Sequence, residues 1–332
     1  MPQTHSDFAD LAVIDRSGLV ESRHAGTAVV LGADGAVLHA LGDIDAPMYP
    51  RSSLKPFQAL ASMQSGVPLR GAEVALACAS HVGRTEHQEL AASMLSKAGL
   101  TDDDLQCPAA WPRHEATRME AIRSGGSPSR LAFNCSGKHA AFLWACTENG
   151  WDTATYLDPD HPLQRRVVEV VEDYAGEKIT HLAVDGCGAP VPAISLRGLA
   201  SATGRLSRSP GNKSSDARAT TIATAMLDYP WAVHGHGEEN TVVMEGLGVI
   251  AKLGAEGVLI LGTSDGVSCA LKIRDGNARA ATLVGLTLLA SVDAVEIDAM
   301  TAVLEKINKP VLGGGRPVGR IRVAKPVLDL LD

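Results

Sequence analysis

The sequence predicts an α/β protein of the α+β type, in which one sheet takes strands from both chain ends and is flanked by helices. Strand-like segments lie near the N-terminus (residues 11–14, 25–31 and 37–41) and near the C-terminus (residues 257–262, 267–273 and 319–324). Between them, helical patterns dominate residues 54–227, so we expect a helical region inserted between the terminal sheet elements. Because no repeat, low-complexity tract or clean linker divides the chain, residues 1–332 form one predicted unit.

The first elements are short strands, followed by a helix that carries the most distinctive stretch of the chain. The second and third strands are joined by an Ala33-Asp34-Gly35 turn, which is typical of a hairpin. We predict the helix over residues 54–63, because Ser53 suits the N-cap position and Pro56 suits the first turn.

The later helices follow from apolar periodicity and from start signals. Thr85 and Gln88 have the spacing of a capping box, which opens a helix over residues 86–98, and Asp293 opens a helix over residues 294–307. The other predicted helices span residues 115–123, 138–148, 163–174, 196–203, 216–227 and 280–291, and residues 180–185 are predicted to form a strand.

Composition and charge exclude several classes of protein. Hydrophobic residues make up 45% of the chain and aromatic residues only 4%, so small aliphatic side chains must fill a full core. The net charge of −8, without a long basic run, argues against binding to nucleic acid or to an anionic membrane. We expect a cytoplasmic protein, because no apolar stretch approaches 18 residues and the N-terminus lacks a signal-like pattern. Six cysteines in 332 residues do not form a disulfide framework.

The stretch Arg51-Ser52-Ser53-Leu54-Lys55 places a hydroxyl and an amine three residues apart at a helix start. Unpaired backbone N–H groups there favour developing negative charge, so Ser52 is a candidate nucleophile. Lys55 is the candidate base, provided that burial or a neighbouring cation favours its neutral form. Since Ser-x-x-Lys is common by chance, an ordinary polar cap with a solvated lysine is the alternative.

Two further segments could complete such a site. Ser80-His81 ends an apolar segment and is either a polar contact or proton relay, or a simple turn. Lys272 lies within an apolar strand and points either to solvent or inward. An inward Lys272 near Ser52 and Lys55 would favour the neutral amine that a base requires.

Two loops concentrate reactive side chains, namely Asn134-Cys135-Ser136-Gly137-Lys138-His139 and Asp185-Gly186-Cys187-Gly188. Their two cysteines, with nearby nitrogen or oxygen groups, could hold Zn²⁺, although the spacing is not that of a CxxC pair. Two free buried thiols are the alternative. The His234-Gly235-His236 run does not have helical ligand spacing, and we interpret it as a loop.

Taken together, these motifs resemble the Rhizobium-etli-type L-asparaginases, the asparaginase II family of serine-lysine amidohydrolases, from about residue 27 to residue 325. The motifs that carry the resemblance are Arg51-Ser52-Ser53-Leu54-Lys55, Ala79-Ser80-His81, Asn134 to His139, Asp185-Gly186-Cys187-Gly188 and the strand around Lys272. Five motifs in the right order are far more specific than any one of them.

The resemblance implies a fold similar to serine β-lactamases and penicillin-binding proteins, and hydrolysis of L-asparagine to L-aspartate and ammonia by a homodimer. It implies that Ser52 and Lys55 form one catalytic pair and that Ser80 and Lys272 form a second. The implied zinc ligands are Cys135, Lys138 and Cys187. The predicted substrate contacts are Arg51, His81, Asn134, His139, Asp185 and Gly186.

The predicted mechanism is acyl transfer, in which Ser52 attacks the side-chain amide and backbone N–H groups hold the oxyanion. Zinc would tune substrate binding without supplying the nucleophile.

One alternative is a serine hydrolase of the same fold acting on β-lactams or peptides. Against it, Lys272 is followed by Ile273-Arg274 where β-lactamases have Lys-Thr-Gly. The other is a non-catalytic zinc-binding scaffold. The sequence leaves open which Ser-Lys pair is primary, which group completes the metal site, and whether asparagine or glutamine is preferred.

Overall fold

The computed structural model describes residues 7–331, and its main feature is an eight-stranded sheet with the strand order β10-β11-β1-β2-β9-β8-β7 and β3 beside β2. All of its strand pairs are antiparallel. The strands are β1 (Ala9–Arg16), β2 (Leu19–Leu31), β3 (Val37–Leu41), β7 (Ile250–Gly254), β8 (Val258–Gly262), β9 (Ser268–Ile273), β10 (Val311–Gly313) and β11 (Arg316–Val323). The sheet therefore takes strands from both chain ends, as predicted.

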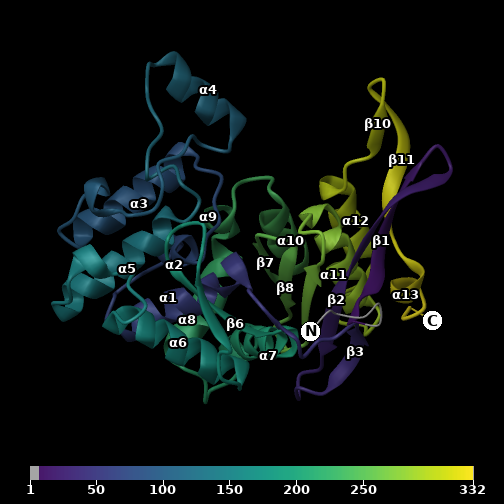
Figure 1. Cartoon of the computed structure of the whole chain (residues 1–332), viewed down its shortest axis with the longest axis horizontal. Coiled ribbons are helices and arrows are strands. Elements are labelled where there is room, and N and C mark those ends of the chain that lie inside the picture. Colours follow the sequence, from purple (N-terminus) through teal and green to yellow (C-terminus); the bar gives the residue numbers. More distant parts are fainter. Residues whose placement is uncertain (1–6, 332) are drawn as a thin grey trace.

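Helices fill the middle of the sequence and form a second region beside the sheet (Figure 1). The helices of the chain are α1 (Lys55–Gln64), α2 (Ala72–Ala77), α3 (Thr85–Lys97), α4 (Glu115–Arg123), α5 (Ser136–Asn149), α6 (Pro162–Ala175), α7 (Leu196–Ser207), α8 (Ala217–Asp228), α9 (Pro230–Val233), α10 (Glu239–Leu247), α11 (Ala281–Ala290), α12 (Ile297–Ile307) and α13 (Lys325–Leu328). A smaller sheet joins β4 (Pro47–Met48), β6 (Pro190–Ser195) and β5 (His181–Val184). The predicted α+β organisation, with a helical region between terminal sheet elements, is confirmed.

The sheet is covered on both faces, because alternate residues of β8 meet different helices. On one face, Gly262 approaches Ser207 of α7 so closely that an added Cβ would lie 2.8 Å from that side chain. On the other face, Leu259 and Leu261 contact Gly285 of α11. All five residues of β8 are consequently buried, which explains why this strand is a continuous apolar run rather than an alternating one.

Two predicted helix starts are wrong. Helix α3 begins at Thr85 after an Arg84 N-cap, and its cap comes from His87, whose Nδ1 accepts the backbone N–H of Arg84. Helix α12 begins at Ile297 after a Glu296 N-cap, so Asp293 does not open it. Start signals in a sequence compete with tertiary contacts, and boundaries are the first feature to shift.

Four elements near the site have no counterpart among the predictions: α2, α10, β6 and β7. Helix α2 and strand β7 are short, at six and five residues, and short apolar runs carry little periodicity. β7 proves to be decisive for the site.

No helix within residues 7–331 is both long enough and apolar enough to cross a membrane.

Candidate active site

The Ser52 segment is a short 3₁₀ helix, η2 (Arg51–Leu54), which leads directly into α1 at Lys55. Ser53 is fully buried and donates its hydroxyl to the carbonyl of Pro50 at 2.8 Å, so the predicted N-cap role of Ser53 is wrong and its side chain holds the turn instead. Ser52 is half-buried, and within residues 7–331 its hydroxyl makes no hydrogen bond. The hydroxyl is therefore available to a substrate.

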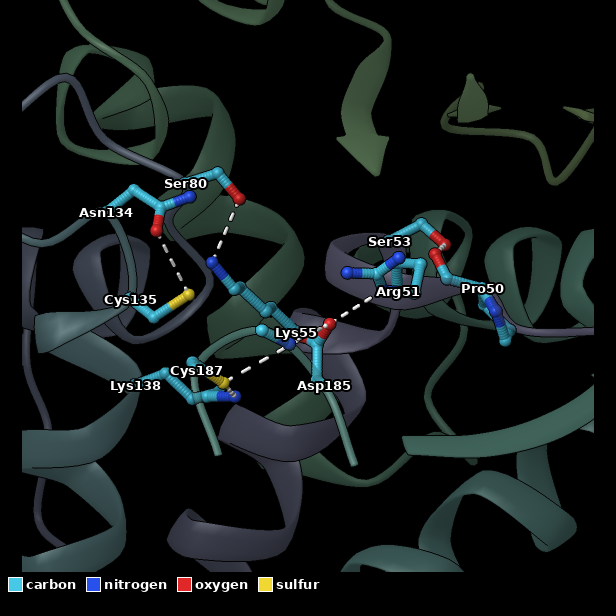
Figure 2. Close-up of polar contacts among 11 residues, drawn as sticks. Pro50, Arg51, Ser53, Lys55, Ser80, Asn134, Cys135, Lys138, Asp185 and Cys187 are labelled. Carbon is cyan, nitrogen blue, oxygen red and sulfur yellow. Dashed lines mark hydrogen bonds and ion pairs between the residues drawn. The ribbon is translucent and has the colours of Figure 1, made fainter. Parts of the chain in front are cut away.

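Lys55 is completely buried and reaches the second predicted serine (Figure 2). Its Nζ donates to the carbonyl of Ala79 at 2.5 Å and to Oγ of Ser80 at 2.9 Å. These two acceptors use two of the three positions around the amine nitrogen. In the neutral amine the third position is a lone pair, which is free to accept a proton from a neighbouring hydroxyl.

A second buried lysine meets Ser80, and it is Lys252 of β7. Its Nζ lies 2.8 Å from Oγ of Ser80 and donates to the carbonyl of Leu253 at 2.8 Å. Burial, together with the positive charge of Lys55, holds the pKa of Lys252 well below its usual range. Ser80 thus lies between two amines, and the neutral form of Lys252 can accept the proton of its hydroxyl.

The structure corrects the predicted pairing of Ser80 with Lys272. Lys272 lies on β9, with β8 between it and β7, and its Nζ donates to the carbonyl of Ile273 at 2.5 Å. Its side chain lines a different cavity, on the side of Thr27 and β4. The sequence left the orientation of Lys272 open, and the strand lysine that meets Ser80 is Lys252.

Strand β7 reaches the site because Gly254 allows a close approach of two backbone segments. A Cβ at Gly254 would lie 2.7 Å from the carbonyl oxygen of Pro50 and 3.3 Å from the backbone nitrogen of Ser53. Only glycine lets the strand pack against η2 at this distance. The run Lys252-Leu253-Gly254 therefore occupies the edge strand beside η2, and it lacks the threonine of the Lys-Thr-Gly run of β-lactamases.

Arg51 and Asp185, both predicted as substrate contacts, form an ion pair on the open side of η2. Nε of Arg51 donates to Oδ1 of Asp185 at 2.6 Å, and the two side chains are 25% and 12% exposed. The N–H of Gly186 also donates to Oδ1, at 2.9 Å. Arg51 has a φ of 55°, which is rare for a residue with a side chain and is often found at functional sites.

The two predicted thiols lie near each other, to the left of this ion pair in Figure 2, and neither forms a disulfide. Lys138 Nζ donates to Sγ of Cys187 at 3.0 Å, and the Cys135 thiol donates to Oδ1 of Asn134 at 3.4 Å. The adjacent Cys135 thiol lowers the pKa of Cys187. Burial acts in the opposite direction, and the charge of Lys138 adds to the lowering. Burial lowers the pKa of Lys138, but the thiols of Cys187 and Cys135 outweigh it and raise this pKa overall. The cluster therefore favours a thiolate at Cys187 beside an ammonium.

His139 completes the buried cluster. Its Nδ1 lies 2.7 Å from the hydroxyl of Tyr156, whereas its Nε2 is buried and has no hydrogen-bond partner within residues 7–331. Burial lowers the pKa of His139, and the Cys187 thiol acts in the opposite direction. Two thiols, this ring nitrogen and, once deprotonated, the Lys138 amine are the types of donor that zinc accepts. Among residues 7–331, however, no three His, Cys, Asp or Glu side chains are grouped closely enough to bind a metal without Lys138.

The structure does not bring His81 to the substrate side. His81 is completely buried and stacks on His87 with 4.8 Å between ring centroids. Its Nδ1 accepts the N–H of Gly83 at 3.0 Å, so Nε2 carries the proton and donates to Oγ of Ser136 at 2.9 Å. With both nitrogens bonded to protein, the predicted substrate contact of His81 is wrong, and the ring is part of the scaffold under Ser80.

Sequence reasoning missed Lys252, although a signal existed. Ile250-Ala251-Lys252-Leu253 has the same form as Ala270-Leu271-Lys272-Ile273, namely a lysine inside an apolar run. Lys252 is buried and Lys272 is half-buried, and the strand order decides which of them meets Ser80.

Similar solved structures include one described as Mglu in its glutamate form, at 14% identity and a TM-score of 0.46, covering 81% of this chain and 61% of that chain. Another is Mglu in its native form, at 14% identity and a TM-score of 0.46, covering 82% of this chain and 66% of that chain. A third is a β-lactamase from Mycobacterium bovis, at 15% identity and a TM-score of 0.39, covering 85% of this chain and 95% of that chain. The chain thus spans about 61% of the first of these structures.

The comparison with curated proteins finds no match. A family model, in contrast, covers most of the chain. The model described as L-asparaginase II matches residues 12–323, a range that includes every residue of the Ser-Lys and thiol groups. This protein therefore belongs to the L-asparaginase II family.

Proposed function

We propose that the protein is an L-asparaginase, which hydrolyses L-asparagine to L-aspartate and ammonia through an acyl-enzyme formed on Ser52. The observation that carries the proposal is the line of polar groups Lys55, Ser80 and Lys252, which begins one helical turn from Ser52. Family membership narrows the chemistry to amide hydrolysis of this type. The closely packed buried amines supply the base that a serine requires.

The proton of Ser52 passes to Lys55 as its oxygen attacks the side-chain amide carbon. Lys55 already donates to Ala79 and Ser80, so its remaining position receives the proton. Ser80 can relay a proton onward to Lys252, whose neutral form burial favours. The lysine amines then give the proton to the nitrogen of the substrate amide. The carbon–nitrogen bond breaks, and ammonia leaves. Water then attacks the ester carbon, and Ser52 recovers its proton.

Arg51 and Asp185 are proposed to recognise the amino-acid end of the substrate. Their ion pair borders Ser52 and is partly open to solvent. An amino acid carries both charges, so its carboxylate can take the place of Asp185 on Arg51 while its ammonium binds Asp185. The exchange replaces one ion pair with two, which offsets part of the cost of desolvating the charged groups of the substrate. Asn134 and Gly186, next to the thiols, stay predicted substrate contacts.

Zinc is proposed to bind at Cys135, Cys187 and Lys138, with His139 or Asp185 as a further donor. When bound, the ion would supply positive charge and hold the 185–188 turn in place. Asp185 belongs to that turn, so the metal would act on substrate binding rather than on the nucleophile. The homodimer and the cytoplasmic location stay proposals that rest on the family resemblance and on the sequence.

One assay tests the proposal against its rivals. Ammonia release is measured with L-asparagine, L-glutamine and β-aspartyl amides, and nitrocefin turnover is measured in parallel. We expect ammonia release that is fastest with L-asparagine. Faster release from L-glutamine would reassign the substrate within the family. Turnover of nitrocefin alone would favour β-lactam chemistry, and metal binding without any turnover would favour a non-catalytic scaffold.

A further inference from the structure

A cavity of about 220 Å³ lies apart from the Ser-Lys and thiol groups, between the sheet and β4. Thr27 of β2 and Lys272 of β9 are direct cross-strand neighbours and form one wall, which Arg274 extends. The facing wall comes from the segment that carries Asp43 and Met48. Since one water occupies about 30 Å³ in the liquid, the cavity holds a molecule of several heavy atoms.

The sheet wall presents two cationic groups, Lys272 and Arg274, and the acidic Asp7 also lines the cavity. Within residues 7–331, neither Lys272 nor Arg274 makes a salt bridge, and the guanidinium of Arg274 stacks on Phe8 at 4.2 Å. Lys272 is half-buried and uses one N–H on the carbonyl of Ile273, which leaves the others for a further acceptor. The Thr27 hydroxyl also has no hydrogen bond to residues 7–331, although Thr27 is only 6% exposed.

The facing wall is acidic and rigidly held. Oδ1 of Asp43 accepts the N–H groups of Asp45 and Ala46 at 3.0 and 3.1 Å, which leaves its second oxygen for other partners. Asp45 forms a two-bond ion pair with Arg197 at the start of α7, at 2.6 and 2.9 Å. The wall is thus braced from outside the cavity, so the cavity exists before any ligand arrives.

We propose that this cavity is an accessory binding site for a small α-amino acid. The ligand carboxylate binds Lys272 and the Thr27 hydroxyl, and its ammonium group faces Asp43. Lys272 has N–H groups left after its bond to Ile273, and the Thr27 hydroxyl has no hydrogen bond to residues 7–331, so one carboxylate can accept from both. The site goes beyond the proposed asparaginase activity, because none of the groups that bind the ligand belongs to the catalytic machinery. It is nevertheless close to Ser52 in the chain, because Met48 lines the cavity and η2 begins three residues later.

The test follows the methyl group of Met48, one of eight methionines, by NMR of the full-length protein labelled with ¹³C-methyl methionine. The Met48 signal is assigned by its loss in Met48→Leu, and L-aspartate and succinate are titrated separately. Neither probe has an amide to hydrolyse, so the experiment is independent of the proposed activity. We expect L-aspartate to shift the Met48 signal with a dissociation constant in about the millimolar range or below.

Lys272→Gln should weaken this binding by about tenfold or more, as expected for a lost charged hydrogen bond. Lys306→Gln, a change at an exposed lysine on α12, should leave it unchanged and is the matched control. Succinate lacks the ammonium group and should bind more weakly than L-aspartate, a difference that Asp43→Asn should reduce. A Met48 signal that does not move with L-aspartate, or equal affinity in Lys272→Gln, would overturn the site. Equal affinity for both probes would overturn the role of Asp43.

Discussion

Nζ of Lys252 lies 2.8 Å from Oγ of Ser80, although the two residues are 172 positions apart in the chain. The contact joins the edge strand of the main sheet to the helical region. It exists because β7 packs against η2 through Gly254, which places Lys252 beside the amine of Lys55. The two amines that contact Ser80 thus come from different regions, Lys55 from the helical region and Lys252 from the sheet.

Replacing Lys252 with methionine should therefore abolish most of the amidase activity. We expect kcat to fall by about 10² or more, the usual contribution of a general base, because Ser80 loses its proton acceptor. Lys272→Met is the matched control, since it removes a strand lysine that does not contact Ser80. Steady-state ammonia release from both purified variants provides the measurement. Equal losses in the two variants would contradict the assignment of Lys252.

Ser52→Ala should remove turnover while leaving the protein folded. A lost nucleophile costs many powers of ten in kcat, on the order of 10⁶ where the catalytic groups act as a unit. The partly exposed hydroxyl makes no hydrogen bond within residues 7–331, so its removal should leave the thermal unfolding temperature nearly unchanged. Ser80→Ala is the informative partner variant. If Ser80→Ala is inactive and Ser52→Ala retains a tenth of the activity or more, the nucleophile is Ser80.

The free energy of unfolding should depend on pH because the amine of Lys252 is buried and its pKa is lowered. Because the folded pKa of Lys252 is lowered, the unfolded chain binds one more proton between that value and the ordinary value of 10.5. The free energy of unfolding should rise with pH in this window, and the contribution should be lost as pH falls through it. Lys252→Met should remove this pH-dependent contribution. The free energy of unfolding of the variant, measured with denaturant relative to that of the parent protein, should therefore be higher at about pH 6 than at about pH 9. A constant difference between the two proteins would contradict a neutral Lys252.

Activity should follow the same amines. We expect kcat/KM to rise with pH on the alkaline side of neutrality, because the bases act only in their neutral form. Because the pKa of Lys252 is lowered, kcat/KM should reach its plateau at a pH below the ordinary pKa of lysine. A profile that stays flat from about pH 6 to about pH 10 would rule out a titrating lysine base.

Removing zinc should chiefly raise KM for asparagine. The thiol cluster adjoins the Asp185 turn, whereas Ser52 and Lys55 lie on η2 and α1. Metal content is measured by elemental analysis before and after chelation, and kcat and KM are determined on the same samples. Loss of all turnover in folded, metal-free protein would move zinc to the chemical step. Purified protein without zinc would contradict the metal site itself.

The sequence predicted the two regions and the serine, thiol and arginine segments, because each is a local pattern. Ser52 and Lys55 share one helical turn, and the loops around Cys135 and Cys187 have distinctive compositions. The sequence could not select Lys252 over Lys272, because that choice depends on the order of strands in the sheet. It also misplaced His81, whose burial comes from the packing of His87 and Ser136 against it.

The antiparallel pairing of β1 with β11 has a consequence for biosynthesis. β1 ends at Arg16, and its partner β11 begins only at Arg316, so the first strand made lacks one neighbour until almost the whole chain has left the ribosome. The helical region can form earlier, but β7, and with it Lys252, comes after that region. An edge that stays open during synthesis can pair with the wrong strand, and contacts so distant in sequence form slowly. The nascent chain therefore carries Ser52 and Ser80 for most of translation without Lys252, the amine that contacts Ser80 in the folded protein.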